Sequence, residues 1–324
     1  MTRILITGVT GQDGFYLSQA AHERGYEVFG LVRGQNNPKL AMLCKELPFI
    51  VPVEGDLLDR HSICLAMDQA RPDYVFNLGA ITYIPLSWQQ PELVYNVNFL
   101  GVQRLLEEAA DHNVKAFVQA STSEMFGSAK LEDEGDLGFD QDSNMLPSSP
   151  YAIAKLAAHH LCLAYRSSAL INAISAIMFN HESPRRGESF VTRKITLGVA
   201  RIKAGLQDKL ELGNLESIRD WGYAPEYMEA LLLLAEKGRE SSYVVATGNT
   251  ASVGEFARYV AGRALVSENH IVSTNVNNRV NDVDRLCGDP WLIKMELDWK
   301  AKTLWHRLAE IMLEADARKV FSEL

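Results

Sequence analysis

The first fourteen residues decide the fold, because Arg3-Ile4-Leu5-Ile6-Thr7 runs directly into Gly8-Val9-Thr10-Gly11-Gln12-Asp13-Gly14. The apolar, β-branched run predicts a strand, and a helical pattern follows through about Arg24. Glycines allow a tight turn, a close approach to a pyrophosphate and close packing of helix on strand, while the helix N-terminus offers free N–H groups to an anion. We therefore predict a dinucleotide-binding turn with these cofactor contacts: Gly8, Thr10, Gly11, Gln12, Asp13 and Gly14.

A second strand, predicted from Gly25 to Arg33, indicates which dinucleotide binds. In folds of this kind, an acid at the end of this strand bonds the adenosine ribose and repels a 2′-phosphate. Arg33 stands there with no acid beside it, which favours NADP. The alternative is a solvated arginine at a strand end, which leaves NAD possible.

Strands and helices continue to alternate along the chain. Further strands are predicted at 49–53, 74–80, 115–120 and 170–178, with a long helix over 91–111 and later helices over 253–265 and 302–319. This rhythm predicts an α/β fold with a Rossmann-like, doubly wound parallel sheet and a smaller, mixed C-terminal substrate domain. We expect the cofactor domain to span 1–179, with part of 216–250 returning to it, and the substrate domain to span 180–324. Strand ends supply the remaining cofactor contacts: Asp56, Leu57, Leu78 and Ala80.

Composition narrows the class of protein. The 324 residues are 47% hydrophobic and 23% charged, with a net charge of −9. That balance is typical of a globular protein and argues against a general binder of nucleic acid or anionic membranes. No apolar run reaches membrane-spanning length, and the start of the chain predicts a strand, so we expect a cytoplasmic protein. The cysteines Cys44, Cys64, Cys162 and Cys287 form no C-x-x-C pair, which predicts reduced thiols and no metal site.

Two short stretches carry the candidate chemistry, Ser121-Thr122-Ser123-Glu124 and Tyr151 with Lys155. Tyrosine and lysine at i and i+4 share one helix face, where an ammonium is expected to lower the pKa of the phenol. Alone, such a pair is most often a surface feature, and a lone glutamate is most often solvated. After a dinucleotide-binding turn, the pair predicts hydride-transfer chemistry, with Thr122 bonding the same substrate oxygen. Glu124 supplies a second base, which simple alcohol oxidation does not need.

A basic segment follows Phe179. It contains Arg185, Arg186, Arg193 and Lys194, and Arg219 and Arg279 lie further along. Guanidinium groups match phosphate oxygens bidentately, so a bound diphosphate is one explanation for this cluster in an acidic chain. A solvated basic face is the alternative.

These segments carry a family resemblance. The glycine turn and the Tyr151/Lys155 pair resemble the extended short-chain dehydrogenase/reductase superfamily. Nearly the whole chain resembles the GDP-mannose 4,6-dehydratase family, most specifically in the segments 179–188, 190–194, 212–215 and 219–222, and also in 11–14 and 120–124.

The resemblance implies a cycle of oxidation, elimination and reduction on a GDP-sugar. Tyr151 and Lys155 would begin the oxidation at C4, with hydride passing to NADP, while Thr122 holds the C4 oxygen. Glu124 would remove the C5 proton. Water would leave from C6, and the hydride would return there. The resemblance also implies a homodimer or homotetramer. It makes 180–324 a GDP-sugar-binding domain with these substrate contacts: Ser123, Asn180, Val191, Lys194, Gly213, Arg219 and Arg279.

The chain departs from the family pattern at several points. Gly34-Gln35-Asn36 follows Arg33, Ala80-Ile81-Thr82-Tyr83 lies where sugar contacts are expected, and Ser148 replaces an arginine before the catalytic tyrosine. The substrate is therefore open between GDP-mannose and another GDP-hexose or GDP-heptose. Two rivals remain. A GDP-sugar 4-epimerase or 4-ketoreductase would not need Glu124, and a cofactor-sensing binding protein would need none of the four catalytic side chains.

Overall fold

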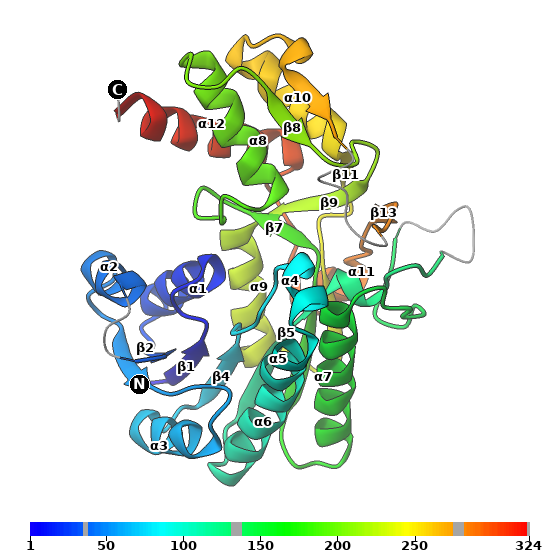
Figure 1. The fold of residues 1–324 in the computed structure, drawn as a ribbon. Helices are drawn as coiled ribbons and strands as arrows, with labels where there is room; N and C mark the ends of the chain where they lie inside the picture. The colour runs from blue at the N-terminus through cyan, green and yellow to red at the C-terminus, as the bar shows by residue number, and fades with distance from the viewer. Residues whose placement is uncertain (35–37, 131–137, 275–281, 323–324) are drawn as a thin grey trace.

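The computed structural model describes residues 1–34, 38–130, 138–274 and 282–322. Arg279, Gln35 and Asn36 therefore lie outside the described residues. A larger unit holds a central sheet between helices, and a smaller unit sits above it and carries the C-terminal helix (Figure 1). None of the described helices is both long and apolar enough to cross a membrane.

The larger unit is built on seven parallel strands in the order β3-β2-β1-β4-β5-β6-β10. The order reverses between β1 and β4, and ligands of such sheets bind in the crevice at the carboxyl ends beside that reversal. The predicted doubly wound sheet is confirmed. Its strands are β1 (Arg3–Thr7), β2 (Glu27–Val32), β3 (Val51–Glu54), β4 (Tyr74–Asn77), β5 (Ala116–Thr122), β6 (Ala173–Met178) and β10 (Ser242–Val245).

Helices cover both faces of this sheet, each through a continuous apolar core. On one face pack α1 (Gln12–Glu23), α2 (Pro38–Glu46), α9 (Ala224–Lys237) and α11 (Trp291–Leu297). On the other face pack α3 (Arg60–Ala70), α6 (Gly101–Asp111) and α7 (Pro150–Ser167).

The predicted helix over 91–111 has three parts. It begins as α5 (Pro91–Tyr95), passes through a π-helical turn (Asn96–Leu100) and continues as α6. Within that turn, the Asn98 side chain bonds both the N–H and the carbonyl of Ile81, each at 2.8 Å. Such bulges occur often at functional sites, and this one fixes the chain just after β4, where α4 (Ile84–Gln89) begins.

The smaller unit has a core of its own around Trp221. Three helices enclose this core, α8 (Val191–Lys203), α10 (Val253–Ala264) and α12 (Trp305–Ser322). Strand β9 (Ile218–Tyr223) pairs in parallel with β7 (Asn180–Glu182) and β13 (Arg285–Leu286) and antiparallel with β11 (Thr250–Ser252). A separate parallel pair joins β8 (Leu210–Leu212) to β12 (Ile271–Ser273). The predicted mixed character of this part is confirmed.

The chain enters the smaller unit, leaves it and enters it again. After β9, helix α9 packs against α1, and β10 pairs with β6 from Ser242 beside Ser175 to Val245 beside Met178. Later, Trp299 stacks edge-on against Tyr227 of α9, with ring centroids 5.8 Å apart. The two units are thus interleaved along the sequence.

Candidate active site

The glycine turn has the shape that a pyrophosphate requires. Gly8 adopts φ +68°, and a Cβ there would lie 2.8 Å from the Gly79 nitrogen. A Cβ on Gly14 would lie 2.4 Å from the Cα of Val9, so only glycine lets α1 pack this closely on the turn. Gly11 caps α1 without a side-chain hydrogen bond, which leaves the helix N–H groups to an anion. These residues fit the pyrophosphate of a nicotinamide dinucleotide.

The other predicted cofactor residues follow the carboxyl ends of parallel strands, at the same edge as the glycine turn. Arg33 is exposed directly after β2, and Asp56 is half-buried after β3 with its Oδ1 accepting from the Leu58 N–H at 3.0 Å. Leu57 is buried beside it, and Leu78 and Ala80 follow β4. This edge can therefore accommodate an adenosine at β2–β3 and a nicotinamide at β4–β5.

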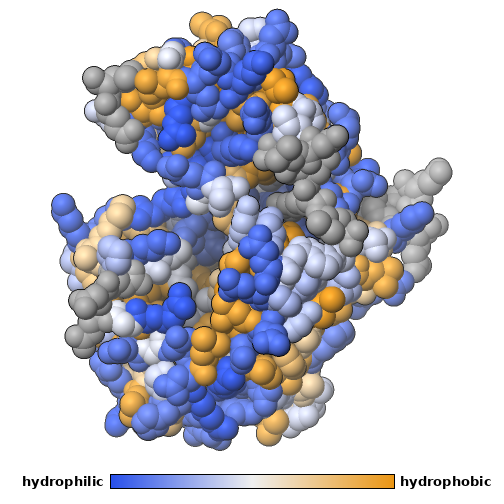
Figure 2. Space-filling view, in the orientation of Figure 1, coloured by the Kyte–Doolittle hydropathy of each residue, from blue (hydrophilic) through white to orange (hydrophobic). Residues whose placement is uncertain are grey.

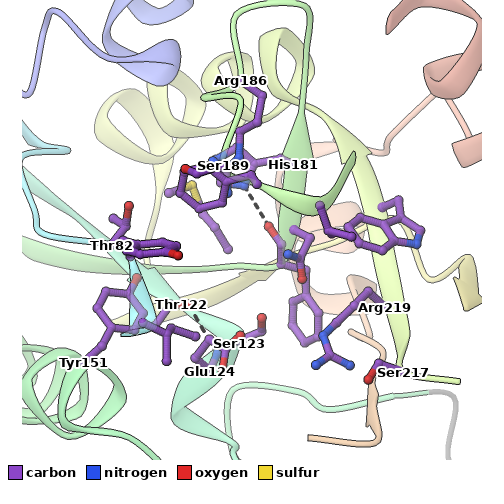
Figure 3. A pocket seen from close by; sticks show the side chains of 18 of the residues that line it. Thr82, Thr122, Ser123, Glu124, Tyr151, His181, Arg186, Ser189, Ser217 and Arg219 are labelled. Carbon is purple, nitrogen blue, oxygen red and sulfur yellow. Dashed lines mark hydrogen bonds between the residues drawn. The ribbon is translucent and has the colours of Figure 1, made fainter. Parts of the chain in front are cut away.

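A cavity of about 530 Å³ lies between the two units. The molecule is hollowed there, with hydrophilic residues around the opening (Figure 2). Thr122, Glu124, Tyr151 and Lys155 all line this cavity. Thr122 ends β5, Glu124 lies in the turn that follows, and Tyr151 and Lys155 lie in the first two turns of α7. Figure 3 shows Thr122, Glu124 and Tyr151 at the cavity wall. The structure thus brings together the four predicted catalytic residues, of which the first, Thr122, and the last, Lys155, are 33 positions apart in the sequence.

The electrostatics of the tyrosine and lysine correct one prediction. Burial raises the pKa of Tyr151 to about 12, and the opposing effect of its hydrogen bond with Thr122 is smaller. The prediction that Lys155 lowers the pKa of this phenol is therefore wrong for the chain by itself. Burial also lowers the pKa of Lys155 to about 8. The physical reason is that the Lys155 ammonium donates to the carbonyl of Ala120 rather than to the phenol.

A buried chain of hydrogen bonds supports that carbonyl. Thr7 donates to the Asn77 Oδ1 at 2.6 Å, Asn77 donates to the Gln119 Oε1 at 2.8 Å, and Gln119 donates to the Ala120 carbonyl at 2.7 Å. Because these residues lie on three adjacent strands, β1, β4 and β5, the position of the Lys155 amine is tied to the middle of the sheet.

Thr122 and Glu124 are held by a short 3₁₀ turn over Ser123–Met125. The Thr122 hydroxyl accepts from the Glu124 N–H at 3.3 Å, and Thr122 is buried while Glu124 is half-buried at the cavity wall. Figure 3 shows Thr122, Ser123, Glu124 and Tyr151 grouped on one side of the cavity, with Arg219 and Ser217 further along it. A substrate carbon near Tyr151 would therefore also be within reach of a second base.

The predicted substrate residues line the same cavity wherever the structure describes them. They are Ser123, Asn180, Val191, Lys194, Gly213 and Arg219. Val191 opens α8, whose N-terminus has no side-chain cap and no acid in its first turn. Arg219 is buried and donates to Asp282 at 3.0 Å, while Ser217 donates to the same carboxylate at 2.6 Å. The first residue of α8 and two cations, Lys194 and Arg219, thus line the cavity.

The basic segment as a whole is not a phosphate site. Arg185 pairs with Glu46 at 2.6 Å, and Arg193 pairs with the buried Asp316 at 2.7 Å. Neither arginine lines the cavity. For these two, the explanation from a bound diphosphate is wrong, because each charge instead ties two parts of the fold together.

The cavity is also lined by polar residues to which the sequence analysis gave no site role, among them His181, Ser217 and Asp282. His181 lies on β7, and its Nε2 is 3.1 Å from the Asp13 Oδ2 of the glycine turn. Gln12 donates to the His181 carbonyl at 3.1 Å and accepts from Ser183 at 2.7 Å. Gln12 and Asp13 therefore join the cofactor loop to the substrate side, a role that no local pattern indicates.

The glycine turn, the sheet order and the group Thr122, Tyr151 and Lys155 define a member of the extended short-chain dehydrogenase/reductase superfamily. The comparison with family models is more specific, because residues 5–312 match the family described as GDP-mannose 4,6 dehydratase. The chain belongs to the GDP-mannose 4,6-dehydratase family, a family of hydro-lyases.

Relatives from distant organisms agree with this assignment. The chain is 38% identical to GDP-mannose 4,6 dehydratase 1 of Arabidopsis thaliana, over 96% of this chain and 89% of that protein. It is 34% identical to the human GDP-mannose 4,6 dehydratase, over 96% of this chain and 90% of that protein.

Solved structures show the same fold. One is a protein described as RMD from Pseudomonas aeruginosa complexed with NADPH, with a TM-score of 0.81, 25% identity and coverage of 98% of this chain and 100% of that chain. Another is a UDP-glucose 4-epimerase from Thermotoga maritima, with a TM-score of 0.85, 23% identity and coverage of 98% and 99%.

Proposed function

We propose that this chain is a GDP-sugar 4,6-dehydratase that converts GDP-mannose, or a closely related GDP-hexose or GDP-heptose, to the GDP-4-keto-6-deoxy sugar. The observation that carries the proposal is the presence of Glu124 in one cavity with Tyr151 and Lys155. Oxidation of an alcohol needs one base, and elimination of water needs another for a carbon acid.

Each residue has a role in this sequence. Tyr151 accepts the proton of the C4 hydroxyl, which Thr122 orients, and Lys155 favours the phenolate once its ammonium turns from Ala120 toward the phenol. The bound nicotinamide supplies the hydride acceptor at C4 and the hydride donor at C6. Glu124 accepts the C5 proton, which the C4 ketone acidifies, and passes it to the C6 hydroxyl, which leaves as water. When hydride reaches C6, C5 takes the proton that Tyr151 accepted from the C4 hydroxyl. The net change is the loss of one water, and the cofactor is recycled.

The far end of the cavity would hold the diphosphate of the nucleotide. Lys194 and Arg219 supply positive charge, and the uncapped start of α8 at Val191 supplies N–H groups. Gly213, which follows β8, lines the same cavity, as do Asn180 and Ser123. We assign Arg279 to the same clamp from the sequence resemblance alone.

We propose NADP as the cofactor. An arginine without a neighbouring acid follows β2, which suits a 2′-phosphate. The relative from Pseudomonas aeruginosa is described with NADPH, whereas a dTDP-glucose 4,6-dehydratase from Bacillus anthracis, at 19% identity and a TM-score of 0.83, is described with NAD. NAD is therefore the alternative that a binding measurement must exclude.

The rival activity is a GDP-sugar 4-epimerase or 4-ketoreductase. The same fold houses a UDP-glucose 4-epimerase. A 4-epimerase or 4-ketoreductase reaction in this chain would need Tyr151 and Lys155 but not Glu124. Product mass separates the three outcomes, since dehydration loses one water, epimerisation changes nothing and reduction adds two hydrogens.

Glu124→Gln tests the proposal, because it keeps the shape of the side chain and removes the base. The variant should bind GDP-mannose and NADP as the wild type does, with dehydration slowed roughly 100- to 10,000-fold. In this variant, exchange of the C5 proton with solvent deuterium should disappear as well. Tyr151→Phe is the matched control, because it should stop the earlier oxidation. An undiminished rate in Glu124→Gln would remove Glu124 from the mechanism, and a wild type that dehydrates no GDP-sugar would remove the proposed activity.

We also propose a cytoplasmic homodimer or homotetramer. None of the four cysteines, all of which lie in the described part of the chain, forms a disulfide, as expected in a reducing compartment. Helices α4, α5 and α7 lie against one another and expose Trp88, Leu93 and Ile153, a set of large apolar side chains that a second copy could cover. Figure 2 shows apolar residues on the face that carries α5.

A further inference from the structure

A cluster of three metal-ligand side chains lies on the outer face of the larger unit, between α3 and the end of α6. Cys64 and Asp68 are one turn apart on α3, and His112 caps α6. The thiol sulphur, one carboxylate oxygen and one imidazole nitrogen all lie within 4.8 Å of one another. None of the three lines the catalytic cavity.

The histidine in this cluster is held in one orientation. Its Nδ1 lies 2.7 Å from the Glu108 carbonyl oxygen, which can only accept, so Nδ1 carries the proton. In the neutral ring, Nε2 then has the free lone pair, and it lies 3.4 Å from the Asp68 Oδ1. A backbone carbonyl that fixes the tautomer in this way is the usual outer-shell partner of a metal-binding histidine.

The lone pair on the His112 Nε2 and the Asp68 carboxylate are both hydrogen-bond acceptors, so this contact needs a positive charge between the two atoms. A proton on Nε2 would provide it and make an ion pair of His112 with Asp68. A cation bound by both, with Cys64 as a third ligand, would provide it as well. Nitrogen and sulphur donors beside a carboxylate suit zinc and not magnesium or calcium, which prefer oxygen ligands alone.

The spacing suits a small tetrahedral ion. Bonds of about 2.0–2.3 Å hold neighbouring ligand atoms roughly 3.3–3.8 Å apart. The imidazole and the carboxylate already meet that spacing at 3.4 Å, and the sulphur lies within 4.8 Å of both ligand atoms. Asp68 is mostly exposed, so a fourth position remains for water.

We propose that Cys64, Asp68 and His112 bind one zinc ion, which clips α3 to the C-terminal end of α6. The expectation of no metal site rested on the absence of C-x-x-C spacing, which does not exclude a site assembled from two helices. Zinc takes the thiolate, so the thiol proton goes to solvent as the ion binds. Glu108, which hydrogen-bonds the Cys64 thiol, retains Arg60 as its partner at 3.0 Å.

Zinc binding by the full chain tests this site. After treatment with a chelator, calorimetric titration with zinc chloride should give one equivalent bound, with proton release that varies with the ionisation enthalpy of the buffer. Cys64→Ser and His112→Gln should each weaken binding about 10-fold or more. Cys44→Ser removes another half-buried thiol on a surface helix and should bind as the wild type does. Cobalt should give a thiolate charge-transfer band that Cys64→Ser abolishes.

The thermal midpoint supplies a second measurement. Excess zinc should raise it in the wild type and in Cys44→Ser, and by less in Cys64→Ser and His112→Gln at the same zinc concentration. Equal zinc affinity in the wild type and in Cys64→Ser, or no binding by the wild type, would reduce the cluster to an ion pair between His112 and Asp68. Because no measurement depends on turnover, the result is independent of the proposed dehydratase activity.

Discussion

The Nε2 of His181 lies 3.1 Å from the Oδ2 of Asp13, and this contact links the dinucleotide-binding turn to the first strand of the smaller unit. The Tyr227 ring stacks on the imidazole with centroids 4.9 Å apart and covers one face of it. Burial opposes both charges, but their mutual attraction outweighs it, so the pKa of Asp13 falls to about 2 and the pKa of His181 rises.

This pair predicts a pH-dependent contribution to stability. The His181 contribution is fully present below its unfolded pKa of about 6.5 and is lost as pH rises through its raised folded value. The Asp13 contribution is lost as pH falls from about 3.8 through about 2. Asp13→Asn should therefore lower the free energy of unfolding by about 1–3 kcal/mol at pH 5.5 and by less at pH 9.

Denaturant titration at the two pH values measures this effect, and a proton NMR titration should show a lower His181 pKa in the variant. Glu23→Gln, an exposed change on the same helix, is the control. Equal destabilisation at both pH values would show that the charge of His181 does not contribute.

Lys155 predicts a conflict between stability and activity. Its pKa falls from 10.5 to about 8 because burial penalises the ammonium. The buried ammonium therefore lowers the free energy of unfolding by on the order of 3 kcal/mol at most below about pH 8. This loss disappears as the pH rises to about 10.5. Lys155→Met should raise the thermal midpoint at pH 7, lose that advantage near pH 10.5, and have no activity. A variant less stable than the wild type at pH 7 would show that the bond to Ala120 outweighs the penalty.

Arg219 predicts the strength of nucleotide binding. Arg219→Ala should weaken GDP binding by about 1.5–3 kcal/mol, the scale of a hydrogen bond to a charged group. Calorimetry with GDP measures this loss, and Arg263→Ala, an exposed arginine on α10 outside the cavity, is the control. Unchanged GDP affinity in Arg219→Ala would mean that the guanidinium only forms the ion pair with Asp282 and does not bind the nucleotide.

Arg33 predicts the cofactor preference. Arg33→Ala should weaken NADP binding roughly 10- to 100-fold, the loss of one charge-assisted contact, and leave NAD binding unchanged because NAD has no 2′-phosphate. Dissociation constants for both cofactors, in the wild type and the variant, give the preference ratio. A wild type that binds NAD as tightly as NADP would contradict the choice.

Local sequence patterns predicted the sheet well. β-branched runs identified the first six sheet strands to within a few residues, because buried parallel strands are continuous apolar segments. The spacing of Tyr151 and Lys155 also predicted a shared helix face. Helix α8 was not predicted, because its first turn holds the charged residues Arg193 and Lys194 and was interpreted as part of a basic segment. Ile195 and Val199, four residues apart, lie on its buried side.

Contacts between distant segments were beyond any local pattern. Asp13 and His181 are 168 residues apart, and each looks like an ordinary polar residue in its own segment. The raised pKa of Tyr151 depends on how deeply α7 is buried and on the carbonyl to which Lys155 donates. Side chains from separate elements meet only when the whole sheet is formed, so their electrostatics follow from the tertiary structure.

The interleaving of the two units bears on how substrate preference can be exchanged between relatives. Because β10 completes the sheet beside β6 and α9 packs on α1, a single crossover after β6 would replace part of the sheet together with the sugar side. Chimeras that move only the smaller unit need three separate inserts, one from β7 to β9, one from β11 to β13 and one for α12, because α9, β10 and α11 pack in the larger unit. A single recombination event in this fold therefore cannot exchange the whole substrate side of the cavity. Single substitutions of cavity residues are the shorter route to a new substrate.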